Sequence, residues 1–206
     1  MKQIIQELIT SGYLKTPAII DAFQKIDRRD FVPDELKEQS YLNAPLPIGY
    51  GQTISQPLTV AFMLELLQPE RGDRILEVGS GSGWQTALLS HIVSDGAGKV
   101  FAVEIIPELM EFGRKNTSKY NFVKGGIAKF HHFNAINGMP EEAPFDRIIS
   151  AASGQEIPQA WKEQLKIGGR IVAPVKDSIH LLIKKDKNSF EEKNYPGFVF
   201  VPLVGN

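Results

Sequence analysis

The stretch Ile75–Gly83, which reads ILEVGSGSG, constrains the fold of this chain more than any other part of the sequence. It is a short apolar run that ends in glycines alternating with serines, and Trp84–Val93 follows with the apolar pattern of a helix. Glycine lets the backbone approach a ligand closely, and the first N–H groups of a helix have no partner within the helix. A buried strand, a glycine turn and a helix in this order predict a small-molecule site, around which the other elements are organised.

Strands and helices alternate from this turn onward. The expected strands are Asp73–Val78, Lys99–Glu104, Lys129–Phe133, Phe145–Ala151 and Arg170–Val175, and the helices between them are Trp84–Val93, Pro107–Lys119 and Ile157–Leu165. Ile179–Lys185 and Gly197–Leu203 are strand-like and close in sequence, so we expect them to pair antiparallel at the edge of the sheet. This order is typical of an α/β fold with a doubly wound, mostly parallel sheet.

The residues before the turn predict a helical cap and a long loop. Ile4–Ile9 has apolar residues at helical spacing, and Thr16 followed by proline is typical of a second helix start. Asp30–Tyr50 is irregular and rich in proline, and a helix is expected from Pro57 to about Leu67. A loop of this length in a compact chain packs against something, and loops often carry function. We therefore expect an N-terminal helical cap and a loop beside the small-molecule site.

Length and charge set limits on the function. A chain of 206 residues, 42% of them hydrophobic, is long enough for one domain with a core. We expect a single domain over residues 1–206, in which 1–56 form the cap and the substrate loop and 57–206 form the cofactor-binding sheet. The net charge of −1 gives no overall basic field that would favour nucleic acid as a partner.

The chain has no cysteine, which excludes disulfides, thiolate metal sites and a cysteine nucleophile. The N-terminal apolar segment is interrupted by glutamine and glutamate, and no stretch approaches the length of a membrane span. We therefore expect a cytoplasmic protein without a membrane partner, and a monomer.

The chemistry of the turn favours one class of cofactor. Its spacing is G-x-G-x-G, not the G-x-G-x-x-G of dinucleotide sites, and no Lys-Ser/Thr follows that would make a P-loop. Glu104 ends the next strand, 21 positions after Gly83 (104 − 83), where its carboxylate can accept from ribose hydroxyls. Glu77 lies two positions before Gly79, where its carboxylate would repel the pyrophosphate of NAD. The positively charged sulfonium and ammonium groups of S-adenosylmethionine would not be repelled. These features favour S-adenosylmethionine over NAD, although Glu77 could also be a solvated or capping carboxylate.

Several longer motifs resemble the protein-L-isoaspartate O-methyltransferase family over roughly residues 19–203. They are RRDFVPDEL and SYLNAPLPIGYGQTISQP within Arg28–Pro57, EVGSGSG at Glu77–Gly83, EEAPFDRI at Glu141–Ile148, IPQAWKEQLKIGGRIVAPV at Ile157–Val175 and the terminal FVFVPL. The resemblance implies a Rossmann-like S-adenosylmethionine-dependent methyltransferase fold. It also implies methyl transfer from S-adenosylmethionine to the carboxylate of isoaspartyl residues in damaged peptides and proteins, after which the ester cyclises to a succinimide.

The same resemblance implies roles for individual residues. Thr53, Ile54 and Ser55 match the active-site segment, with the Ser55 hydroxyl bonded to the substrate carboxylate, and Val199–Pro202 would help to form a peptide groove. The implied cofactor-binding residues are Glu77, Gly79, Ser80, Gly81, Gly83, Glu104, Ile105, Asn134 and Ala135. No metal-ligand cluster is visible in the sequence.

A carboxylate nucleophile has an ordinary pKa of about 4 and is already ionised at neutral pH, so no general base is required. We therefore expect the histidines to be structural or exposed; they are His91, His131, His132 and His180.

Two segments depart from the family pattern. Phe133-Asn134-Ala135 stands where the family usually has Gly-Asp-Gly, and Ala151-Ala152-Ser153 stands where it typically has Gly-Ala-Ala. Asn134 keeps a carbonyl that could accept from the adenine amine but carries no charge. Two alternatives follow: a diverged S-adenosylmethionine-dependent methyltransferase that acts on another carboxylate or a small molecule, or a catalytically silent homologue that binds a protein partner.

Overall fold

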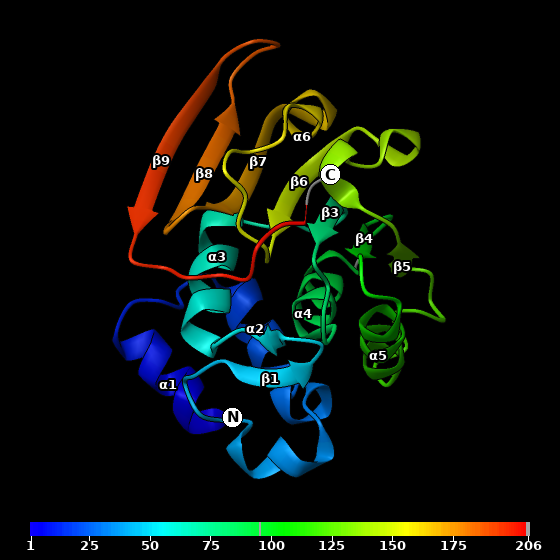
Figure 1. Ribbon diagram of the computed structural model, residues 1–206. Helices are drawn as coiled ribbons and strands as arrows, with labels where there is room; N and C mark the ends of the chain where they lie inside the picture. Colours follow the sequence, from blue (N-terminus) through cyan, green and yellow to red (C-terminus); the bar gives the residue numbers. More distant parts are fainter. Residues whose placement is uncertain (95, 205–206) are drawn as a thin grey trace.

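A seven-stranded sheet in the order β5-β4-β3-β6-β7-β8-β9 forms the centre of the computed structural model, which describes residues 1–94 and 96–204 (Figure 1). Its strands are β3 (Arg74–Val78), β4 (Lys99–Glu104), β5 (Ala128–His132), β6 (Phe145–Ser150), β7 (Leu165–Val175), β8 (Ser178–Lys184) and β9 (Phe190–Pro196). The pairs from β5 to β7 are parallel, and β8 and β9 are antiparallel to their neighbours. The predicted doubly wound sheet with an antiparallel edge is confirmed.

Helices cover both faces of this sheet. The helices are α1 (Lys2–Thr10), α2 (Pro17–Lys25), α3 (Pro57–Leu67), α4 (Trp84–Val93), α5 (Pro107–Ser118) and α6 (Gln159–Gln164). Side chains alternate across a strand, so Ile75 and Val100 join one apolar cluster with residues of α1 to α5. Leu76 and Phe101 join a second cluster with Trp161 of α6. The central strands are buried on both sides, as expected of parallel strands between two layers of helices.

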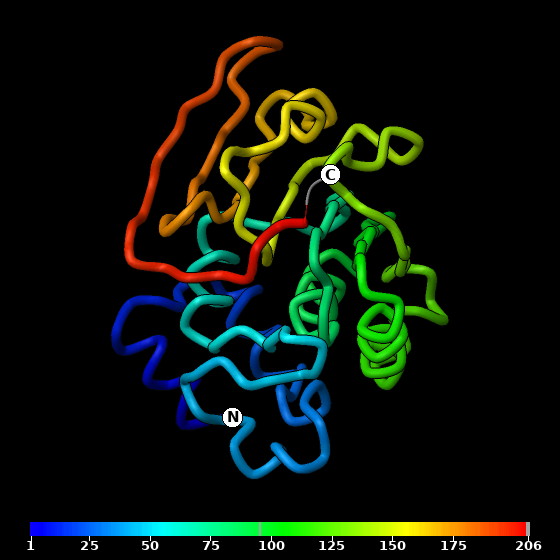
Figure 2. Tube along the Cα trace, in the orientation of Figure 1, coloured from blue at the N-terminus to red at the C-terminus, as the bar shows by residue number. Residues whose placement is uncertain are grey.

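The N-terminal residues form the predicted helical cap. α1 and α2 pack against α3 and α4, and the chain then passes through the short 3-10 helices η1 (Arg28–Phe31) and η2 (Asp34–Gln39). A separate two-stranded sheet follows, made of β1 (Leu46–Gly49) and β2 (Gln52–Ile54). Figure 2 shows this blue-to-cyan part of the chain gathered together, away from the orange hairpin of β8 and β9. The segment expected to be irregular therefore contains short ordered elements.

The edge of the sheet differs from the sequence-based expectation. Gly197–Leu203 was predicted to pair with the β8 segment, but β9 is Phe190–Pro196, joined to β8 by a short turn at Lys185–Ser189. Asp186 stabilises that turn, because its carboxylate accepts from the backbone N–H groups of Asn188 and Ser189. Gly197 has a φ of +95°, a left-handed conformation in which the chain leaves the sheet. The prediction was wrong because Phe190–Pro196, which is less apolar but nearer to β8 in the sequence, pairs with β8 in place of Gly197–Leu203.

The helix predicted at Ile157–Leu165 is shorter in the structure. α6 begins after Pro158 and ends at Gln164, because β7 already starts at Leu165 and includes Gly168 and Gly169. The glycine pair therefore lies inside β7, whose register with β6 is irregular. The remaining 3-10 turns, η3 (Ala135–Asn137) and η4 (Pro140–Glu142), lie between β5 and β6.

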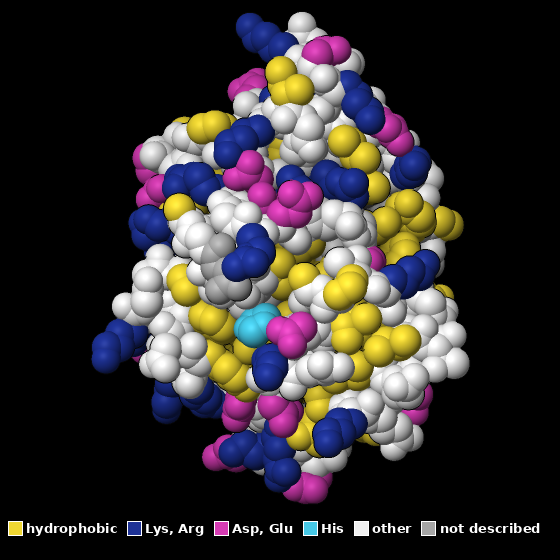
Figure 3. Space-filling model, turned by 180° about the vertical axis from the view of Figure 1, so that it is seen from behind, with side chains coloured by type: hydrophobic (Ala, Val, Ile, Leu, Met, Phe, Trp, Pro, Cys, Tyr) yellow, Lys and Arg dark blue, Asp and Glu magenta, His cyan; other side chains and the backbone are white. Residues whose placement is uncertain are grey.

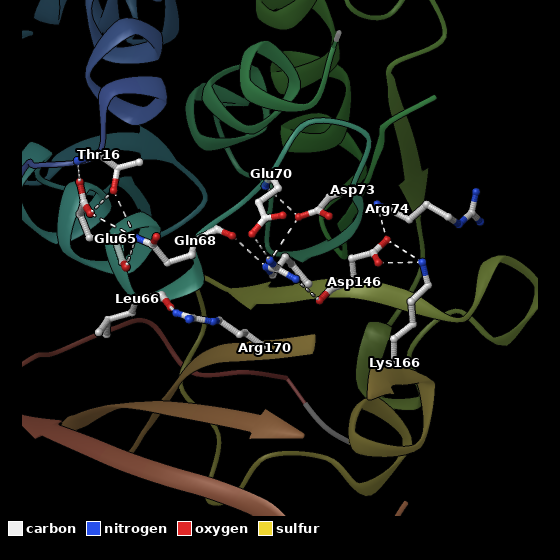
Figure 4. Close-up of polar contacts among 11 residues, drawn as sticks. Thr16, Glu65, Leu66, Gln68, Glu70, Asp73, Arg74, Asp146, Lys166 and Arg170 are labelled. Atoms are coloured by element: carbon white, nitrogen blue, oxygen red, sulfur yellow. Dashed lines mark hydrogen bonds and ion pairs between the residues drawn. The ribbon is translucent and has the colours of Figure 1, made fainter. Parts of the chain in front are cut away.

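A polar network fastens the end of the sheet at which β3 and β6 begin. The Asp146 carboxylate accepts from the backbone N–H of Arg74 at 2.9 Å and lies 2.7 Å from the Lys166 ammonium nitrogen (Figure 4). Arg170 donates to the carbonyl of Leu66 at 2.8 Å, which ties β7 to the end of α3. The opposite end of the strands, where their carboxyl termini lie, is left for the site.

Candidate active site

A cavity of about 400 Å³ lies at the carboxyl ends of the parallel strands. This is the position at which open α/β sheets bind ligands. Its walls come from the loop before α3, the first turn of α3, the glycine turn, the ends of β4, β5 and β6, and the C-terminal segment Val199–Val204. In Figure 1 that red segment runs from β9 across the ends of the central strands. Elements far apart in the sequence therefore share one cavity.

The glycine turn is shaped by backbone conformations that favour glycine. Gly79 and Gly81 have φ values of +81° and +48°, and both line the cavity. The backbone N–H groups of Gly79 and Ser80 donate to the Val103 carbonyl at 2.8 and 3.1 Å, which fixes the turn to β4. Gly83 serves packing, because a Cβ placed there would lie 2.5 Å from the Gly113 carbonyl oxygen of α5.

Glu104 holds the turn from the neighbouring strand. One oxygen accepts from the backbone N–H of Gly81 at 2.9 Å, and the other accepts from Ile105 and Ile106 at 2.9 and 3.1 Å. The side chain is buried at the cavity wall, and Ile105 beside it is part of the same wall. His132 fixes this corner, since its Nε2 lies 3.1 Å from the Ile105 carbonyl oxygen. The predicted ribose-binding carboxylate is therefore held rigidly where a ligand can reach it.

Glu77 points elsewhere. Its carboxyl group is fully buried and accepts from the Thr86 hydroxyl at 2.6 Å and the Gln85 amide at 3.2 Å, both on α4. Burial raises its pKa to about 8, and the nearby Glu104 also raises it, while the bonds from Thr86 and Gln85 lower it. It does not line the cavity. The structure places this residue as a link between β3 and α4, not as the solvated carboxylate that the sequence left open.

Thr53 and Ser55 line the cavity, whereas the side chain of Ile54 between them is buried in the core. The Ser55 hydroxyl has no hydrogen-bond partner in the described part of the chain. Alternation along an extended segment explains this arrangement, because neighbouring side chains point to opposite sides. Two hydroxyls therefore face the space in front of the glycine turn.

Arg28 holds this loop from the side that faces away from the cavity, a role that its sequence motif does not indicate. Its guanidinium is fully buried, lies 5.4 Å from the centre of the Trp84 ring, and has its pKa lowered by burial to about 10. It donates to the backbone carbonyls of Ser40 (2.7 Å), Leu42 (3.2 Å), Ala44 (2.9 Å), Ile54 (3.5 Å) and Ser55 (3.1 Å). No local sequence pattern signals a buried arginine, because its partners are backbone atoms of a distant loop.

The segment Phe133-Asn134-Ala135, which differs from the family pattern, lines the cavity. The Asn134 side-chain carbonyl accepts from the backbone N–H of Ile136 at 3.1 Å, so it caps η3. The indole N–H of Trp161 donates to the Ala135 carbonyl at 2.8 Å, which anchors this wall to α6. The oxygen that the sequence offered to an adenine amine is thus already engaged by the backbone.

The C-terminal segment closes the cavity. Ser153 donates its N–H to the Val201 carbonyl at 2.8 Å, and Leu203 donates to the Ser153 carbonyl at 2.8 Å. These bonds attach the segment to the loop after β6, beside Ala151 and Ala152 of the cavity wall. Val199, at the start of the segment, is 93% exposed. An apolar side chain is therefore exposed at the mouth of the cavity.

The histidines lie outside the cavity wall. His91 and His180 are 2.7 Å from the carboxylates of Asp21 and Glu192, and His131 packs between the rings of Phe101 and Phe133. Burial lowers the pKa of His131. Within residues 1–94 and 96–204 there is no group of His, Cys, Asp and Glu side chains that could hold a metal ion.

The residues named from the sequence therefore divide into two sets. Those at the cavity wall are Thr53, Ser55, Gly79, Gly81, Glu104, Ile105, Asn134 and Ala135. Those behind the wall are Ile54, Glu77, Ser80 and Gly83. Residues of the wall that the sequence did not single out include Gln56 and Thr59 at the start of α3, whose position depends on how α3 meets the sheet.

Comparison with known proteins gives one consistent result. The family model described as protein-L-isoaspartate(D-aspartate) O-methyltransferase matches residues 1–206. Protein-L-isoaspartate O-methyltransferases from Methanopyrus kandleri and Pyrococcus horikoshii are 38% and 40% identical to this chain, over 99% of it in both cases and over 91% and 92% of their own lengths.

Solved structures agree with this result. A structure described as protein-L-isoaspartate O-methyltransferase superimposes with a TM-score of 0.89 at 26% identity, over 100% of this chain and 66% of its own. A candidate enzyme of the same description from Plasmodium falciparum, in complex with S-adenosyl-L-homocysteine, shares the fold at 23% identity, with a TM-score of 0.88 and coverage of 100% and 98%. With the whole-chain match, these likenesses show that the chain belongs to the protein-L-isoaspartate(D-aspartate) O-methyltransferase family.

Proposed function

We propose that this chain transfers a methyl group from S-adenosylmethionine to the carboxylate of L-isoaspartyl residues in damaged peptides and proteins, and so begins their repair through a succinimide. The observation that carries the proposal is the family match over residues 1–206. The shared cavity supports it, since the loop with Thr53 and Ser55 and the glycine turn line the same space.

The residues present fit S-adenosylmethionine. A volume of about 400 Å³ lies in the usual range for small-molecule sites, roughly 300–1,000 Å³. The backbone at Gly79 and Gly81 offers close approach, and the remaining lone pairs of Glu104 can accept from ribose hydroxyls. Ile105, Asn134 and Ala135 would line the adenine region. When bound, S-adenosylmethionine supplies an electrophilic methyl group on a sulfonium.

The chain's own contribution is positioning. The substrate carboxylate is ionised at neutral pH, so the site needs no general base, and no described histidine lines the cavity. Ser55 would donate its hydroxyl to that carboxylate, the Thr53–Ser55 backbone would hold the peptide, and Val199–Pro202 would complete the groove and exclude water. Alignment of this kind is worth roughly 7–11 kcal/mol of the barrier.

The alternatives are less well supported. Both a diverged methyltransferase with another substrate and a silent binding homologue rested on the segment Phe133–Ala135. That segment still forms part of the cavity wall, and relatives at 38–40% identity over nearly the whole chain are named protein-L-isoaspartate O-methyltransferase. We therefore favour the repair methyltransferase over either alternative.

We also propose that the chain acts as one unit over residues 1–206, as a cytoplasmic monomer that does not bind nucleic acid. Acidic and basic side chains are interspersed on the face shown in Figure 3, and the net charge is −1. No helix in the described part of the chain is long and apolar enough to cross a membrane. Sedimentation equilibrium should give a mass near 22.9 kDa, and a species of twice that mass would contradict the monomer.

The decisive experiment supplies labelled S-adenosylmethionine with a synthetic isoaspartyl peptide and, as the matched control, its aspartyl twin. Labelled methyl groups should pass to the isoaspartyl peptide alone. Transfer to both peptides, or to neither, would contradict the proposed substrate. Calorimetry with S-adenosylhomocysteine then separates the remaining cases, because a silent homologue that has lost the cofactor site would show no binding heat.

A further inference from the structure

The cavity must accept negative charge without a basic side chain. If the proposed function holds, two carboxylates enter it, one on the amino-acid end of the methyl donor and one on the isoaspartyl residue. Among the described residues of the wall, Glu104 is acidic and none is lysine, arginine or histidine. Neutral donors and helix ends must therefore balance the incoming charge.

The start of α5 and the glycine turn before α4 are already occupied. Glu104 accepts from the backbone N–H groups of Gly81 in the turn and of Ile105 and Ile106 at the start of α5. A carboxylate of the protein itself thus takes the N–H groups in the turn and at the start of α5, and none of the residues of α4 lines the cavity. This leaves the start of α3, which borders the same cavity through Gln56 and Thr59.

The first turn of α3 has unmet donors. Pro57 has no N–H, the N–H of Leu58 donates to the Asn43 side chain at 3.0 Å, and that of Val60 donates to the Gln56 carbonyl at 3.2 Å. Between them, neither the backbone N–H nor the hydroxyl of Thr59 has a hydrogen-bond partner in the described part of the chain. α3 is 11 residues long, so its N-terminus carries a full helix dipole.

Thr59 is itself well buried. It is 8% exposed, and the exposed part faces the cavity that it lines. Its hydroxyl has no partner among the described residues, and an ionised ligand in the cavity would accept from the hydroxyl and from the backbone N–H together. We propose that Thr59, through its hydroxyl and backbone N–H at the start of α3, forms a carboxylate-binding site for the reactants of this enzyme.

The test compares Thr59→Val, which keeps the shape and removes the hydroxyl, with Thr59→Ser, which restores it. Thr10→Val, on the exposed end of α1, is the matched control. Calorimetry measures the affinity for S-adenosylhomocysteine, which has the carboxylate, and for 5′-methylthioadenosine, which lacks it. Steady-state kinetics measure KM and kcat/KM for the isoaspartyl peptide, and thermal melting checks that each variant folds.

If the donor's carboxylate binds here, Thr59→Val weakens S-adenosylhomocysteine on the order of tenfold and leaves 5′-methylthioadenosine unchanged. If the isoaspartyl carboxylate binds here, the affinities for both nucleosides stay unchanged in Thr59→Val, and kcat/KM for the peptide falls by a similar factor. Thr59→Ser should recover most of either loss. Equal weakening of both nucleosides, or no change in any measurement, overturns the site.

This site rests on the proposed function, but the two fail in different ways. If the wild-type chain methylates the isoaspartyl peptide and Thr59→Val behaves in the same way, the carboxylate site is contradicted and the proposed function stands. If the wild-type chain methylates no peptide, the proposed function is contradicted. The affinities for S-adenosylhomocysteine and 5′-methylthioadenosine then still show whether Thr59 binds a carboxylate.

Discussion

Ser55 and Glu104 line the same cavity but have different surroundings. Glu104 is buried and accepts from three backbone N–H groups around the glycine turn, whereas the Ser55 hydroxyl has no partner in the described residues. Because Glu104 holds the glycine turn, its substitution should change the affinity for a ligand that binds against the turn. The Ser55 hydroxyl is free to form a hydrogen bond with a ligand that enters the cavity. The two residues should therefore separate binding of the donor from binding of the substrate.

Ser55→Ala should lower kcat/KM for the isoaspartyl peptide by roughly 10- to 100-fold, because a hydrogen bond to an ionised group is lost. Its affinity for S-adenosylhomocysteine, measured by calorimetry, should stay within about twofold of wild type. Glu104→Gln should reverse the pattern and weaken S-adenosylhomocysteine first. Equal loss of both properties in Ser55→Ala would mean that Ser55 contacts the donor.

At the scale of elements, the loop between η2 and α3 depends on a single buried cation. The Arg28 guanidinium joins carbonyls from Ser40 to Ser55, so it holds both ends of a segment whose only regular pairing is between β1 and β2. Its removal would break two buried and three partly buried hydrogen bonds to backbone carbonyls. Buried carbonyls left without a donor are costly, because neither water nor another donor replaces the lost bond.

Arg28→Met, which keeps much of the side-chain volume, should lower the free energy of unfolding by roughly 3–5 kcal/mol. Arg28→Lys should fall between Met and wild type, since an ammonium reaches fewer of the carbonyls. Urea denaturation measures both variants. A loss below about 1 kcal/mol in Arg28→Met would show that the loop is held by its other contacts.

For the molecule as a whole, Glu77 couples stability to pH. Its pKa rises from an ordinary value of 4.5 to about 8 on folding, so the folded state binds its proton more tightly than the unfolded state. Stability from this group is fully present below pH 4.5 and is lost as the pH rises to about 8. The sign is opposite to that of an ion-paired carboxylate, because burial without a cation favours the neutral form.

Glu77→Gln keeps the shape and cannot ionise, so it should remove this dependence. Relative to wild type, its melting temperature should rise steadily as the pH is raised from about 5 to 8, and the difference should level off above that range. Thermal melting at a series of pH values measures the difference. A difference that stays constant across the range would show that Glu77 remains ionised in the folded protein.

Much of the fold is readable from local patterns. The apolar runs that became β3, β4 and β6 are buried on both faces in any parallel sheet, and the glycines of Gly79–Gly83 restrict the turn through their own backbone preferences. Proline positions correctly marked the starts of α2, α3 and α5. The edge strand β9 was misplaced, because pairing with β8 depends on the turn at Asp186 and not on which segment is more apolar.

The sequence by itself determined the alternation of strands and helices and the glycine turn, and through resemblance it predicted residues for a methyl-donor site, most of which line one cavity. Only the tertiary structure decided that Glu77 turns to α4, that Arg28 holds the loop before α3, and that Thr59 lines the cavity. The physical reason is that backbone preference and apolar spacing act within a few residues. Side-chain direction, burial and hydrogen-bond partners depend on which distant segments the fold brings together.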